Sequence, residues 1–137
     1  MDTLQIAGSA VTTTARSYSS GDAGIASSYS TVATKTITRV AGYTSLLEFN
    51  CSITSVVGPT ARIATFKIKR DGVEIRTGVS VTIPPTGTGT NTLQSATVHV
   101  VHEDGNTSGG STTYTVEGYG PYITAKQRYL AITQTKK

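Results

Sequence analysis

The sequence contains no tryptophan, a single cysteine and, among 137 residues, only five leucines. A lone cysteine excludes an intrachain disulfide and any metal site that needs several thiolates. Cys51 alternates in step with the apolar residues of segment 47–53, and nothing nearby would stabilise a thiolate. We therefore expect Cys51 to be a small buried side chain rather than a reactive thiol.

Long hydrophobic runs are also missing. The longest extend over three or four residues, far short of the roughly 20 that a membrane helix needs. The first residues show neither the basic nor the apolar segment of a secretory signal peptide. We expect synthesis in the cytoplasm and no membrane partner.

Residues that commonly take part in catalysis or metal binding are few. The two histidines, His99 and His102, lie three apart on one expected strand, so without a bulge they should point to opposite faces and cannot chelate one ion. The only contiguous carboxylates are Glu103 and Asp104, and the sequence has no nucleophile elbow or phosphate-binding glycine loop. We expect no enzyme activity, no cofactor and no metal site.

The positive charge is modest and is not arranged for nucleic acid. The formal net charge is +4, and much of the basic excess falls in segment 62–76. Phe66 is the only aromatic residue there, whereas single-stranded nucleic acid is bound by basic residues interleaved with stacking rings. We expect solvent-exposed strand faces and no nucleic-acid partner.

Threonine, serine and glycine dominate what is present, at 54 of 137 positions. Such a composition, rich in β-branched residues, favours strands over helices, and the length suits one domain. From residue 44 the pattern runs strand, turn, strand at near-regular spacing, with Asp71-Gly72 as a type I′ hairpin signal. The sequence therefore predicts an all-β protein whose residues 44–137 form an antiparallel, jelly-roll-like β-sandwich.

Residues 1–43 differ in composition from the rest. They are low in charge, rich in small polar residues, and hold too little apolar mass for a core of their own. We predict an extended N-terminal arm that is ordered by packing on the sandwich or on a partner chain.

Seven tyrosines with no tryptophan form the most suggestive aromatic pattern. Tyr119, Tyr122 and Tyr129 fall close together in sequence, beside glycines. Tyrosine combines apolar area with a hydroxyl group, which suits a subunit interface and equally a rim over the core. Both interpretations remain open at this point.

Three segments carry a resemblance to a known class of proteins: the hairpin at 64–75, the strand at 114–118 and the terminal strand at 128–134. Together they resemble the β-sandwich modules of tailed-bacteriophage virions, found in trimeric head decoration (cement) proteins and in head or tail fibres. The resemblance covers about two-thirds of the chain and rests on pattern and order.

The resemblance implies a capsid decoration protein on the capsid exterior of the virion, made in the host cytoplasm. It implies a homotrimer that binds the major capsid protein and stabilises the head shell. The expected capsid-binding residues of the arm are Leu4, Ile6, Arg16 and Tyr18, and the expected subunit interface contains the three tyrosines at 119, 122 and 129.

A second hypothesis is a receptor- or glycan-binding module of a tail or head fibre, with sugar held by tyrosines and the polar loops at 86–91 and 103–111. The lack of tryptophan, a preferred stacking platform for sugars, counts against it. A neck or tail structural subunit is a third, weaker possibility.

Overall fold

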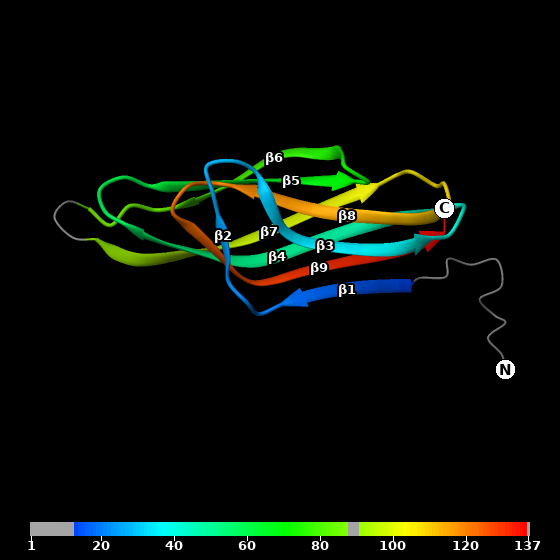
Figure 1. Cartoon of the computed structure of the whole chain (residues 1–137), viewed down its shortest axis with the longest axis horizontal. Coiled ribbons are helices and arrows are strands. Elements are labelled where there is room, and N and C mark those ends of the chain that lie inside the picture. Colours follow the sequence, from blue (N-terminus) through cyan, green and yellow to red (C-terminus); the bar gives the residue numbers. More distant parts are fainter. Residues whose placement is uncertain (1–12, 88–90, 137) are drawn as a thin grey trace.

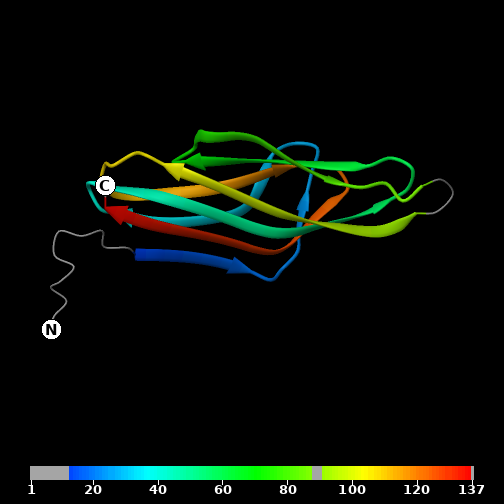
Figure 2. The ribbon, with the colours of Figure 1, turned by 180° about the vertical axis from the view of Figure 1, so that it is seen from behind.

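A computed structural model describes residues 13–87 and 91–136, which form nine strands and no helix (Figure 1). The predicted all-β sandwich is confirmed: two antiparallel sheets pack face to face in an elongated molecule, also seen from behind in Figure 2. The strands are β1 (Thr13–Ser19), β2 (Ala23–Ile25), β3 (Ser30–Arg39), β4 (Tyr43–Val57), β5 (Arg62–Arg70), β6 (Val73–Ile83), β7 (Thr92–Asp104), β8 (Gly110–Tyr119) and β9 (Ile123–Lys136).

The two sheets are built from interleaved parts of the chain. Sheet A has the order β1-β9-β4-β7, with β2 also paired to β9, and sheet B has the order β3-β8-β5-β6. From β3 onward most connections cross from one sheet to the other, and only β5 and β6 are consecutive neighbours within a sheet. Their turn is the predicted hairpin: Asp71 and Gly72 both have positive φ, at 50° and 84°, as a type I′ turn requires.

Alternation along β4 from Ser45 onward explains the core between the sheets. Its inward side chains include Leu47, Phe49 and Ile53, each fully buried, while the residues between them face outward. Phe49 of sheet A meets Phe66 of sheet B with ring centroids 5.9 Å apart, a favourable tilted contact. This apolar layer joins the two sheets into one domain.

Strand β9 contains a bulge that reverses the direction of its side chains. The register with β4 shifts between Asn50 and Ser52, and Gln127 adopts a φ of 52°. One extra residue in a strand changes which face the following side chains occupy. As a result Ala125 and Leu130, five positions apart, are both buried in the core.

Much of the segment expected as an N-terminal arm, residues 1–43, is ordered by pairing with strands of the sandwich. Strand β1 pairs with β9 over its whole length, and β3 pairs with β8. Backbone hydrogen bonds and a few deeply buried side chains, such as Ile25 and Val32, suffice to hold these weakly apolar segments in place. The expected site residues Leu4 and Ile6 lie outside the described residues.

Candidate functional site

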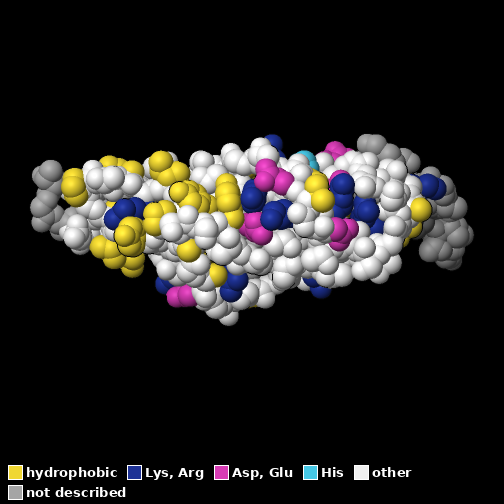
Figure 3. Space-filling model, turned by 45° about the horizontal axis from the view of Figure 1, so that its top comes forward, with side chains coloured by type: hydrophobic (Ala, Val, Ile, Leu, Met, Phe, Trp, Pro, Cys, Tyr) yellow, Lys and Arg dark blue, Asp and Glu magenta, His cyan; other side chains and the backbone are white. Residues whose placement is uncertain are grey.

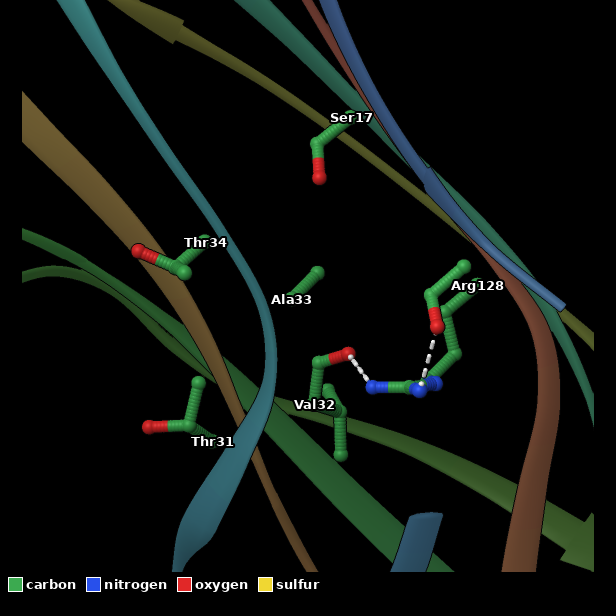
Figure 4. Close-up of a pocket in the computed structure, with 7 residues that line it drawn as sticks. Ser17, Thr31, Val32, Ala33, Thr34 and Arg128 are labelled. Atoms are coloured by element: carbon green, nitrogen blue, oxygen red, sulfur yellow. Dashed lines mark hydrogen bonds between the residues drawn. The ribbon is translucent and has the colours of Figure 1, made fainter. Parts of the chain in front are cut away.

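A pocket of about 180 Å³ opens between the edge strands β1 and β3, where the two sheets meet at one side (Figure 4). Strand β1 contributes Ser17 and Ser19, whose side chains alternate with the exposed residues of that strand. Strand β9 contributes Arg128, and the remaining lining residues are Thr31, Val32, Ala33 and Thr34 of β3.

The bulge in β9 places Arg128 at this pocket. The guanidinium group donates through Nη1 to the Val32 carbonyl at 2.9 Å and through Nη2 to Ser19 Oγ at 2.7 Å. Nε and Nη2 also donate to the Gly21 carbonyl at 3.2 and 3.0 Å. Arg128 therefore ties β9 to β1, to the segment after β1 and to β3 of the opposite sheet.

The pocket can bind a group but cannot carry out acid–base chemistry. Its polar groups are hydroxyls, backbone carbonyls and one guanidinium, with no histidine or carboxylate among the lining residues. The sequence reasoning missed this pocket. The available signal was the polar run at 126–128, which interrupts the alternation of the last strand.

Arg16 and Tyr18, both predicted as capsid-binding, lie on the opposite side of β1 from the pocket. Both are exposed, with 61% of Tyr18 accessible to solvent. In the register of β1 and β9, Tyr18 stands directly opposite Tyr129. The structure thus places one expected arm residue beside one expected interface residue on the outer face of sheet A.

The three tyrosines expected at one interface are not gathered into one cluster. Tyr119 ends β8 and pairs with the ring of Tyr29, at a centroid distance of 5.5 Å. Tyr122 lies in the turn before β9, where the Arg62 guanidinium carbon sits 4.8 Å from its ring centroid. Tyr129 is on the outer face of sheet A.

Exposed apolar side chains gather at the end of the molecule where β4 leads into β5 and β6 into β7 (Figure 3). We name this group the apolar tip; its members are Val56, Ile63, Leu93 and Tyr122, between 53% and 77% exposed. Val56 and Leu93 are opposite each other in the β4–β7 ladder, on the outer face of sheet A. Ile63 is on the outer face of sheet B. The tip therefore has two apolar sides.

The remaining polar groups serve the fold. Asp104 accepts hydrogen bonds from Arg70 and, at 2.6 Å, from the Tyr114 hydroxyl, inside one end of the sandwich. Burial raises the pKa of the Cys51 thiol to about 12, in keeping with the buried side chain that the sequence predicts.

His99 and His102 face opposite sides of β7, as predicted, since their partners on β4 are the outward Asn50 and the inward Leu47. Burial and the nearby Arg76 lower the pKa of His102. Within the described residues, no group of three or more His, Cys, Asp or Glu side chains could hold a metal ion. No helix in residues 13–87 and 91–136 is long and apolar enough to cross a membrane.

Comparisons with known proteins do not assign the chain to a family. No protein-family model matches the chain, and no curated protein matches its sequence.

Proposed function

We propose that this chain is a bacteriophage virion structural protein, a decoration subunit that binds the major capsid protein on the head exterior as a homotrimer. The observation that carries the proposal is the apolar tip, a concentration of exposed large apolar side chains on a small sandwich. Exposed apolar patches of this kind commonly mark sites of protein association. The pocket chemistry supports binding rather than catalysis.

The two sides of the apolar tip favour a ring over a two-fold dimer. In a cyclic trimer each contact is heterologous, so one surface of a subunit meets a different surface of its neighbour. Val56 and Leu93 supply one surface on sheet A, and Ile63 supplies the other on sheet B. Tyr122, one of the residues expected at the subunit interface, belongs to the same tip.

The outer face of sheet A offers a separate surface to the shell. Arg16 and Tyr18, the described residues of the expected capsid-binding set, lie together there and leave the tip free for contacts between subunits. A protein that binds only the mature shell stabilises it by RT ln(1 + [L]/Kd), about 2.7 kcal/mol per site at a hundredfold excess over Kd. Three linked copies strengthen this binding through effective concentration.

Immunogold labelling of purified phage particles from the source strain, imaged by electron microscopy, tests the proposal. We expect gold over the head surface, and labelling that is lost when the protein is stripped from the particle. Gold confined to the tail would overturn the decoration role, and particles without label would overturn the virion assignment.

A glycan-binding fibre module is the second candidate, favoured by one observation. Tyr29 and Tyr119 form an exposed ring pair on the outer face of sheet B. The neighbouring Thr65 and Ser80 add hydroxyl groups, 3.0 Å apart. Sugar-competed, saturable binding of the purified protein to a glycan array would favour this candidate over decoration.

A further inference from the structure

Arg128 carries a positive charge that no carboxylate of the described residues neutralises. The ion pairs of the described chain involve other cations, and the nearby Asp22 lies 3.8 Å from Lys126 instead. All hydrogen-bond acceptors of Arg128 are neutral oxygens, those of Ser19, Gly21 and Val32. A cation that is partly shielded from water attracts an added anion more strongly than a fully exposed cation does.

Donor groups remain free at the pocket. A guanidinium has five N–H donors, and the four hydrogen bonds of Arg128 leave one N–H of Nη1 unused. The Ser17 hydroxyl makes no hydrogen bond with any described residue. Figure 4 shows it directed into the space that Arg128 borders, while the hydroxyls of Thr31 and Thr34 point away.

We propose that this pocket is a carboxylate-binding site that receives an aspartate or glutamate side chain of a partner protein. Two free donors, Nη1–H of Arg128 and Oγ–H of Ser17, match the two oxygens of one carboxylate. A phosphate or sulfate, with three or four oxygens to satisfy, would leave acceptors unpaired. The volume of about 180 Å³ suits one side chain, since sites for small molecules usually measure about 300–1,000 Å³.

The site goes beyond the proposed function, because it requires only an acidic side chain and does not depend on which protein presents it. Its test uses the isolated protein, so a negative result here leaves the particle-labelling experiment unaffected, and the reverse also holds.

Nuclear magnetic resonance titration with two blocked tripeptides tests the proposal. One carries a central glutamate and the other the isosteric, neutral glutamine. We expect the glutamate peptide to shift the Arg128 Nε–H signal and the backbone amides of Ser17 and Val32 saturably, with a Kd of about 1 mM, as two exposed charge-assisted hydrogen bonds allow. The glutamine peptide should leave these signals in place, and sulfate should bind at least about tenfold more weakly than the glutamate peptide.

Variants separate the pocket from general charge attraction. Ser17→Ala removes a donor that has no partner within the described residues, so the fold is retained and we expect about tenfold weaker binding. Arg128→Gln should abolish binding. If the Arg128→Gln variant fails to fold, the affinity of Ser17→Ala still decides the test. Lys136→Gln, which removes an exposed cation at the other end of β9, is the matched control and should bind as the wild type does.

Three results would overturn the proposal: a Ser17→Ala affinity equal to that of the wild type, a loss of affinity in Lys136→Gln as large as in Ser17→Ala, or sulfate binding as tightly as the glutamate peptide.

Discussion

Asp104 is the residue whose ionisation matters most to the fold, because its carboxylate is 5% exposed and joins the two sheets. Burial alone would raise the pKa of this carboxyl, but hydrogen bonds from Tyr114, Arg70 and the Asn106 backbone outweigh burial and lower it. A lowered carboxyl pKa stabilises the fold above the unfolded-state value of about 4, and the contribution is lost as pH falls through the folded-state value.

The change Tyr114→Phe removes one of these donors. We expect it to lower the free energy of unfolding at pH 7 by about 1–3 kcal/mol, since a buried carboxylate loses a hydrogen bond. The pKa of Asp104 should rise toward its unfolded-state value, so less stability depends on its ionisation, and the difference between the variant and the wild type should shrink as pH falls below about 4. Urea unfolding between pH 2.5 and 7 measures both effects.

Tyr18→Phe is the matched control for that experiment, because Tyr18 is 61% exposed and stands opposite Tyr129 on the outer face of sheet A, whereas Asp104 is buried between the sheets. We expect a wild-type profile from it. A Tyr114→Phe profile that superimposes on the wild type at every pH would contradict the assigned role of the hydroxyl.

At the scale of elements, the turn between β8 and β9 depends on a glycine. A Cβ added at Gly120 would stand 2.7 Å from the Ile63 carbonyl oxygen and 3.0 Å from Ala64 Cα, both backbone atoms of β5. The Gly120 amide also donates to the Ala26 carbonyl at 2.9 Å, which holds the turn in place.

We therefore expect Gly120→Ala to destabilise the protein by about 1–3 kcal/mol, the usual cost of overpacking. Gly24→Ala serves as its control, because a Cβ at Gly24 meets nothing within 4 Å, and its effect should stay within about 0.5 kcal/mol. Thermal or urea unfolding compares the two variants. Equal midpoints would show that the turn can move away from β5.

Local patterns predicted some elements well and others poorly, for physical reasons. Alternation identified the inward side of β4, and Asp71-Gly72 identified the β5–β6 hairpin, because both signals are local. The pairing of β1 with β9 joins residues as far apart as Thr14 and Thr133, and no local signal encodes it. The weakly apolar β1 therefore looked like an arm.

The candidate pocket was hidden for a similar reason. Simple alternation along β9 would place the Arg128 side chain on one face of the sheet. The bulge at Gln127 moves this side chain to the other face. A bulge depends on the register with a distant neighbour, here β4, so the sequence of β9 alone could not assign this side chain to the inter-sheet space.

At the scale of the whole molecule, exposed apolar surface is unevenly distributed. The apolar tip occupies one end, where β4 pairs with β7 as far as Val57 while its pairing with β9 stops at Thr54. The tip thus extends past the end of the β4–β9 pairing, with Val56 and Leu93 exposed on the outer face of sheet A and Ile63 exposed on that of sheet B. A projection with two different apolar sides can make heterologous contacts with two neighbouring copies, and such contacts form a closed ring when the rotation between copies closes.

The double variant Val56→Thr/Leu93→Thr tests this arrangement in the purified protein. Both side chains are more than half exposed, and threonine suits a strand, so the free energy of unfolding should change by less than about 1 kcal/mol. Loss of one apolar side of the tip should weaken trimer formation at least tenfold, measured by sedimentation equilibrium. Val73→Thr, at an equally exposed valine beside the β5–β6 turn, should leave association unchanged. A wild-type protein that stays monomeric at high concentration, or a double variant that remains a trimer, would contradict the role given to the apolar tip.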